Sequence, residues 1–121
     1  MTIAYWCVLI AIIMPYVWVG ISKRRRSYDN ATPRKGVNEL PGSKQRAYWA
    51  HENAIEAFAP FAAAVIIAQV RNAPQDTIDV LAIVFTVARV AYGLTYILDR
   101  STLRSLVWFI GFGAVVALFF I

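Results

Sequence analysis

Two stripes of polar and aromatic residues carry the chemistry that this sequence offers. The first stripe has the three-to-four-residue spacing of one helix face: Arg46, Trp49, Asn53, Glu56 and Pro60. The second stripe has the same spacing: Phe85, Arg89, Tyr92 and Tyr96. Both lie within long, largely apolar stretches, where an ionisable group needs a partner, a wet cavity or a function. We therefore predict that the two stripes face each other as a polar seam between two helices.

Helix geometry predicts the deepest pair of this seam. Counted at about 1.5 Å per residue from Arg46 on one helix and from Asp99 on the other, Glu56 and Arg89 both lie about 15 Å deep. We interpret Glu56 and Arg89 as a structural ion pair that fixes the register of the two helices.

Tyr92 and Tyr96 extend the seam toward the nearer surface. The same count sets Tyr92 level with Asn53, and Tyr96 close to the level of Trp49. The two tyrosines either line a binding site or belong to an aromatic belt at the membrane interface.

Basic residues near the seam favour an anionic ligand. Arginines at its mouth and tyrosines one helical turn apart suit a carboxylate-bearing molecule that enters from the cytoplasm. Arg104 falls in the first turn of the last expected helix, where backbone N–H groups are unpaired and the helix dipole is positive. An arginine there would stabilise the thiolate form of a bound thiol.

The sequence offers no set of residues for other kinds of catalysis. The single cysteine, Cys7, and the single histidine, His51, exclude a disulfide within the chain and a Cys/His zinc site, so no metal is expected. Catalytic triads and phosphate-binding glycine loops are also missing, so a nucleophile would come from a cosubstrate. We expect Cys7 to be a small core residue, and His51, which points away from the polar stripe, to be solvated or to face lipid headgroups.

Composition identifies the class of protein. Of 121 residues, 60% are hydrophobic and only 16% are charged, whereas soluble domains carry roughly a quarter charged residues. A disordered tail and an ordinary soluble enzyme are excluded, and a membrane protein is indicated. We predict one all-α domain over residues 1–121, a four-transmembrane-helix bundle with spans at about 3–22, 47–70, 77–98 and 103–121. The first span lacks the features of a signal peptide and is expected to be retained.

The distribution of basic residues predicts the orientation in the membrane. The first loop holds Lys23, Arg24, Arg25, Arg26, Arg34, Lys35, Lys44 and Arg46. The second loop holds only Arg71, and the third holds Arg100 and Arg104. The positive-inside rule therefore sets the first and third loops in the cytoplasm and both termini outside. We interpret the basic loop as a contact with anionic membrane lipids rather than with nucleic acid.

The polar stripe also carries a family resemblance. Residues 46–61, RAYWAHENAIEAFAPF, resemble the second-helix signature of the MAPEG family, the membrane-associated proteins of eicosanoid and glutathione metabolism. That signature has an arginine, an asparagine seven residues later, a glutamate three beyond it and a proline just past the glutamate. Residues 88–96 are similar to the third-helix pattern of the family, and residues 100–104 to the loop that follows. The resemblance covers essentially the whole chain.

This resemblance implies a homotrimer of four-helix subunits that binds glutathione between neighbouring subunits near the cytoplasmic leaflet. The residues it implies for glutathione contact are Asn53, Glu56, Tyr92 and Tyr96, with Arg46 at the mouth and Arg24 reaching in from the adjacent subunit. Arg104 best matches the arginine that holds the glutathione thiolate, and Arg100 competes for that role. The implied reaction is attack on a lipophilic electrophile or a lipid hydroperoxide.

Two functions stay open at this point. The first is a glutathione-dependent transferase or peroxidase of a bacterial inner membrane. The second is a non-catalytic structural or accessory membrane subunit. Trp49 and Ala57 favour the second, because they stand where some catalytic members of the family have an arginine and a tyrosine. A small transporter fits less well, since a seam that opens to one side offers no alternating route.

Overall fold

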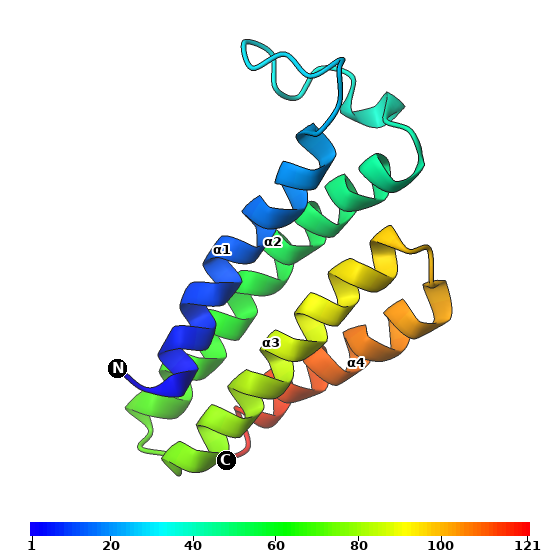
Figure 1. Ribbon diagram of the computed structural model, residues 1–121. Coiled ribbons are helices and arrows are strands. Elements are labelled where there is room, and N and C mark those ends of the chain that lie inside the picture. The colour runs from blue at the N-terminus through cyan, green and yellow to red at the C-terminus, as the bar shows by residue number, and fades with distance from the viewer.

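Four helices and one short 3-10 helix make up the chain, and no strand is formed (Figure 1). The computed structural model describes residues 1–121. The elements are α1 (Ile3–Lys23), η1 (Val37–Glu39), α2 (Gly42–Val70), α3 (Gln75–Ile97) and α4 (Ser101–Ala117). The predicted all-α helical bundle is confirmed.

The helices are arranged so that α3 lies at the centre of the packing. Helix α1 packs along α2 and also contacts α3, while α4 packs along α3 on the other side (Figure 1). Helix α4 barely touches α2 and does not touch α1. One long side of the bundle is therefore open between α2 and α4, and the polar stripes of α2 and α3 lie along this side.

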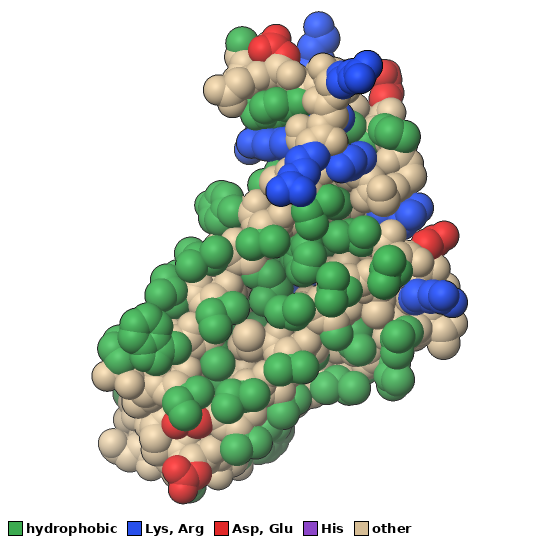
Figure 2. Space-filling model, in the orientation of Figure 1, with side chains coloured by type: hydrophobic (Ala, Val, Ile, Leu, Met, Phe, Trp, Pro, Cys, Tyr) green, Lys and Arg blue, Asp and Glu red, His purple; other side chains and the backbone are tan.

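The surface has the pattern of a protein embedded in lipid. Helices α1, α2 and α3 are long and apolar enough to cross a membrane, and α4 is a shorter apolar helix. Large hydrophobic side chains are exposed over the length of the bundle, and the lysines and arginines gather at one end, around the loop between α1 and α2 (Figure 2). Apolar flanks with a basic end match a membrane span with one charged interface.

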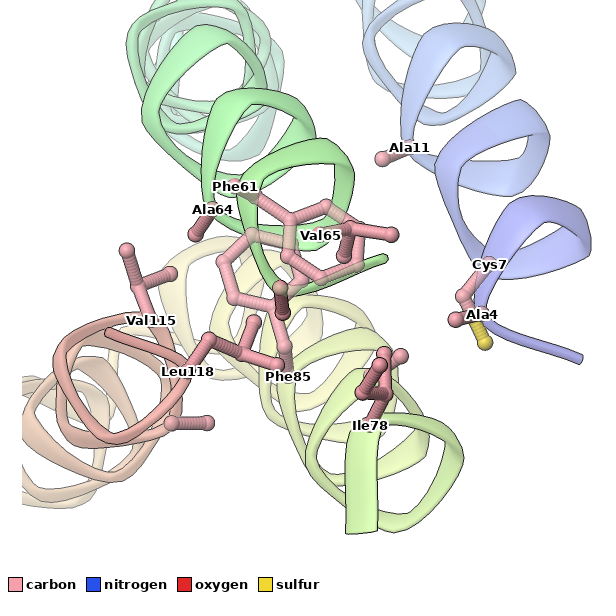
Figure 3. Packing of buried hydrophobic residues seen from close by; sticks show 13 residues of the cluster. Ala4, Cys7, Ala11, Phe61, Ala64, Val65, Ile78, Phe85, Val115 and Leu118 are labelled. Carbon is pink, nitrogen blue, oxygen red and sulfur yellow. The ribbon is translucent and has the colours of Figure 1, made fainter. Parts of the chain in front are cut away.

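The core is built around one aromatic pair. The rings of Phe61 in α2 and Phe85 in α3 stack with centroids 3.8 Å apart. Figure 3 shows the two rings between α2 and α3, with Val115 and Leu118 from the C-terminal end of the chain beside them. Cys7 belongs to the same buried cluster, as expected. Small residues bring α1 close to its neighbours, as is usual where helices pack inside a membrane: Ala4, Ala11, Ala64, Ala68 and Ala82.

A second close approach joins α1 to α3. The indole of Trp18 lies directly on Gly93, where an added Cβ would come within 2.2 Å of the ring. Only glycine leaves room for the tryptophan at this position. Gly93 therefore sets the distance between the two helices near the ends that we predict to lie at the cytoplasmic side.

The helix bounds differ from the predicted spans at two places. Helix α2 begins at Gly42 rather than near residue 47, because polar residues outside the apolar stretch continue the helix. At about 1.5 Å per residue its 29 residues extend about 43 Å, well beyond a hydrocarbon core of about 30 Å. Helix α4 ends at Ala117 rather than at residue 121, and residues 118–120 form a turn.

The turn between α3 and α4 directs α4 back along α3. Asp99 adopts a left-handed conformation with φ of 60°, and the N–H of Arg100 donates to the carbonyl of Thr95 at 2.8 Å. This is the hydrogen-bond pattern that ends a helix sharply. Because the reversal is tight, the first turn of α4 returns next to the last turns of α3.

Candidate functional site

A groove runs along the open side of the bundle between α2 and α4, with α3 as its floor. Its apolar part is a cavity of about 230 Å³. Six apolar residues line this cavity: Ala57, Pro60, Phe85, Trp108, Phe112 and Val115. Three polar residues, Asn53, Glu56 and Arg89, complete its wall. The cavity therefore offers an apolar space with one charged edge.

That charged edge continues into a polar cavity toward the end of the bundle. The second cavity, of about 320 Å³, shares Asn53 and Glu56 with the apolar one. Trp49, Glu52, Tyr92 and Tyr96 line the rest of it. The groove thus changes from apolar to polar along its length, and Asn53 and Glu56 mark the boundary.

Arg89 is the buried cation of the site, with only 5% of its surface exposed. Its Nη2 donates to Asn53 Oδ1 at 2.6 Å, and Asn53 Nδ2 in turn donates to Glu56 Oε2 at 3.5 Å. The direct ion pair expected between Glu56 and Arg89 is therefore replaced by a link through Asn53. The physical reason is reach: the long arginine side chain bonds Asn53, while Glu56 keeps its carboxylate at the exposed wall of the groove.

The tyrosines of α3 form a stacked group with two arginines. Tyr92 and Tyr96 meet edge to face, with ring centroids 5.7 Å apart. The guanidinium carbon of Arg89 lies 4.4 Å from the Tyr92 centroid, and that of Arg104 lies 4.3 Å from the Tyr96 centroid. Cation–π contacts of this kind hold a guanidinium in place while leaving its N–H groups free to donate.

Arg104 is thus brought to the groove, as its position in the first turn of α4 suggested. It lines a further cavity of about 200 Å³ with Tyr92, Ser105, Trp108 and Phe109. Since Trp108 also lines the apolar cavity, the arginine lies next to the apolar part of the groove as well as to the tyrosines.

The other expected arginines are placed differently. Arg46 Nε donates to the carbonyl of Ile97 at 3.1 Å, so this residue ties α2 to the last turn of α3. Arg100 is exposed just before α4, and its carbonyl accepts the N–H of Arg104. Arg24 is exposed at the end of α1, which lies on the far side of the bundle from α4. The structure does not bring Arg24 to the groove of its own subunit.

His51, expected to be solvated or to face lipid headgroups, is partly buried and bonds α1. Its Nδ1 donates to the carbonyl of Pro15 at 2.9 Å, across the contact between α1 and α2. The polar stripe of α2 lies on one side of the helix, and α1 packs against the opposite side, so a residue that points away from the stripe is only partly exposed.

Sequence reasoning missed the contribution of α4 to the apolar cavity. Trp108, Phe112 and Val115 recur at positions i, i+4 and i+7, which is the spacing of one helix face. This signal was present, but it is hard to distinguish from lipid-facing residues in a helix that is apolar all round.

The side chains of the groove are those that suit an organic ligand. No group of three or more His, Cys, Asp or Glu residues could hold a metal ion. The polar end offers two carboxylates, an amide and two phenols, and Arg104 lies in the neighbouring cavity. Together these groups match a ligand that carries both an ammonium and carboxylates.

Comparison with known proteins gives one match. The family model of the MAPEG family matches residues 3–121, essentially the whole chain. No curated protein and no solved structure matches significantly. The family consists of helical membrane bundles of eicosanoid and glutathione metabolism, in agreement with the four-helix architecture and the apolar surface. This chain, an integral membrane protein, is a member of the MAPEG family.

Proposed function

We propose that this protein is a glutathione-dependent transferase or peroxidase that acts on lipophilic electrophiles or lipid hydroperoxides. One observation carries the proposal: the Tyr96–Arg104 group opens directly beside the apolar cavity. A polar cosubstrate and a lipophilic substrate can therefore lie in contact within one groove.

The polar end of the groove fits glutathione, which carries an ammonium group, two carboxylates and a thiol. The Glu56 carboxylate suits the ammonium, and the Asn53 amide and the hydroxyls of Tyr92 and Tyr96 suit the carboxylates. Arg46 uses one of its five N–H donors to bond the carbonyl of Ile97, so the other four can bind a carboxylate of glutathione at the mouth of the groove.

Arg104 is the proposed catalytic residue. Its guanidinium, held over the Tyr96 ring, offers a fixed positive charge to the sulfur and so favours loss of the thiol proton to water. The glutathione thiolate bonds to the electrophilic carbon and either displaces its leaving group or adds to an activated double bond, whose carbanion then takes a proton from water. With a hydroperoxide, the thiolate takes the terminal oxygen as the O–O bond breaks, which gives glutathione sulfenic acid and, after a proton comes from water, the lipid alcohol. A second glutathione converts the sulfenic acid to glutathione disulfide and water. Arg100 is the competing candidate, since it lies one helical turn before Arg104.

The proposal extends to assembly and topology. We propose a homotrimer in which Arg24 of one subunit reaches the groove of the next, which its exposure on the far side of the bundle would allow. The proposed location is a bacterial inner membrane, with both termini outside and the basic first loop in the cytoplasm.

The test is a glutathione titration of the purified, detergent-solubilised protein, followed by the ultraviolet absorbance of the thiolate. Wild type should show saturable thiolate formation. Arg104→Ala should lose it while keeping its oligomeric state and thermal stability, and the matched variant Arg100→Ala should retain it. The proposed role of Arg104 fails if Arg100→Ala abolishes the signal instead.

A non-catalytic structural or accessory subunit is the second candidate. Two contacts favour it. Arg46 already donates to the last carbonyl of α3. The centroid of the Trp49 ring lies 6.2 Å from that of Tyr96, so an apolar ring occupies a place where a hydrogen-bond donor could have faced glutathione. In that case correctly assembled protein would bind no glutathione at millimolar concentration, and the polar seam would serve only to hold the helices together.

A further inference from the structure

The loop between α1 and α2 folds around a cavity of its own, separate from the groove. The loop extends beyond the ends of both helices (Figure 1). The cavity that its residues line has a volume of about 440 Å³. Its lining is almost wholly polar: Arg25, Ser27, Asp29, Thr32, Lys35, Gly36, Glu39, Leu40 and Pro41. We expect a polar cavity at this end of an apolar bundle to lie near the membrane surface.

Arg25 provides a fixed cation in this cavity. Its Nη1 donates to the carbonyl of Ser22 at 2.7 Å, and its guanidinium carbon lies 5.3 Å from the centroid of the Tyr28 ring. The side chain is therefore held in place before any ligand arrives, and its remaining N–H groups are available.

Asp29 shapes the loop rather than offering a free charge. Its Oδ1 accepts the N–H of Ala31 at 2.9 Å, and its Oδ2 accepts the hydroxyl of Thr32 at 3.4 Å. Both carboxylate oxygens are engaged within the turn, so this residue fixes the wall of the cavity.

Two opposite charges remain without a partner in the cavity. Both residues are exposed, and no hydrogen bond or ion pair with another side chain of the protein engages the ammonium of Lys35 or the carboxylate of Glu39. A ligand that carries one anionic and one cationic group would satisfy both, whereas a simple anion would leave Glu39 opposed to it.

We infer that this cavity binds a phosphoethanolamine group, with the phosphate on Lys35 and Arg25 and the ammonium on Glu39. Phosphate suits an arginine and lysine pair with a nearby hydroxyl, here that of Ser27. The group could come from the headgroup of a membrane phospholipid or from free phosphoethanolamine, and the experiment separates these sources.

The test is isothermal titration calorimetry of the detergent-solubilised full chain with three probes: dihexanoylphosphatidylethanolamine, free phosphoethanolamine and dihexanoylphosphatidylglycerol. Binding of the first probe alone assigns the lipid as source, and binding of the first two assigns the soluble group as sufficient. Lys35→Gln and Glu39→Gln should each weaken binding of phosphatidylethanolamine by about tenfold. Arg34→Gln removes the same charge next to Lys35 but does not line the cavity, so it should change binding less than about twofold.

Three outcomes would overturn the inference: no binding of either ethanolamine probe, equal loss in Arg34→Gln and Lys35→Gln, or tighter phosphatidylethanolamine binding in Glu39→Gln. The glycerol headgroup has no ammonium, so its binding should not weaken in Glu39→Gln. None of these residues lines the groove, so glutathione binding to the same variants tests the proposed function independently.

Discussion

Arg89 of α3 and Asn53 of α2 are joined by a 2.6 Å hydrogen bond in the middle of the bundle. The bond gives Nη2 of an almost fully buried guanidinium its acceptor, whereas Nε of the same group has no hydrogen-bond partner, and the Glu56 carboxylate stays at the exposed wall of the groove. One amide therefore separates two tasks, holding the helices together and presenting a carboxylate to a ligand.

Replacing this amide should destabilise the protein. Asn53→Ala leaves the buried guanidinium of Arg89 without its acceptor, and we expect a loss of about 1–3 kcal/mol in the free energy of unfolding. Glu56→Gln is the control, because the exposed carboxylate does not bond Arg89, and it should cost less than about 1 kcal/mol. Reversible unfolding in mixed detergent micelles measures both. Equal losses would mean that Glu56 acts directly on Arg89.

The contact between Trp18 and Gly93 should tolerate no added atom. Gly93→Ala forces the indole away from α3, and we expect a loss of about 1–3 kcal/mol. Gly113→Ala is the matched control, because nothing lies within 4 Å of its added Cβ, and it should be neutral or slightly stabilising. Thermal unfolding in detergent compares the two variants. If Gly93→Ala is as stable as wild type, the tryptophan has another position available.

Arg46 should matter for stability as well as for ligand binding. Arg46→Ala removes the hydrogen bond to the carbonyl of Ile97, and we expect a loss of about 1 kcal/mol in the absence of glutathione. Arg26→Ala removes an exposed arginine from the same end of the molecule and should change stability by less than about 0.5 kcal/mol. Unfolding midpoints without ligand make the comparison, and equal midpoints would remove the capping role.

Phe112 should affect the lipophilic substrate and not glutathione. It lines the apolar cavity but neither of the other two, so Phe112→Ala should raise the KM for a lipophilic electrophile about tenfold and leave glutathione affinity unchanged. Phe120→Ala removes an exposed ring outside the cavity and should leave both unchanged. Steady-state kinetics with each substrate varied in turn measures this. A rise in the glutathione KM instead would mean that the cavity is part of the glutathione site.

The pairing of α2 with α3 followed from spacing and depth, but its details did not. Counting residues placed Trp49 near Tyr96, and the two rings are in contact. The same count placed Arg89 level with Glu56, yet Arg89 bonds Asn53 one turn away. Helical rise locates backbone positions, whereas a long side chain chooses its partner over a range of several ångströms.

Counting residues along a helix could not predict which residues its other faces bury. The hydrogen bond from His51 to Pro15 depends on α1 covering the side of α2 opposite the stripe. The wall that Trp108 and Phe112 build depends on which face of an apolar helix turns toward α3. In lipid both faces are hydrophobic, so hydropathy alone does not distinguish the packed face from the exposed one.

The gap between α2 and α4 has a consequence for how enzyme kinetics should be measured. Glu56, Pro60 and Phe112 at its edge are exposed in the single subunit. We therefore expect the part of the apolar cavity that a neighbouring subunit leaves uncovered to open sideways into the hydrocarbon. A lipophilic molecule would reach it by lateral diffusion within the bilayer, at a concentration set by its partition coefficient. Its apparent KM, expressed per volume of buffer, should therefore rise in proportion to the amount of lipid or detergent in the assay, while that of a water-soluble cosubstrate stays constant.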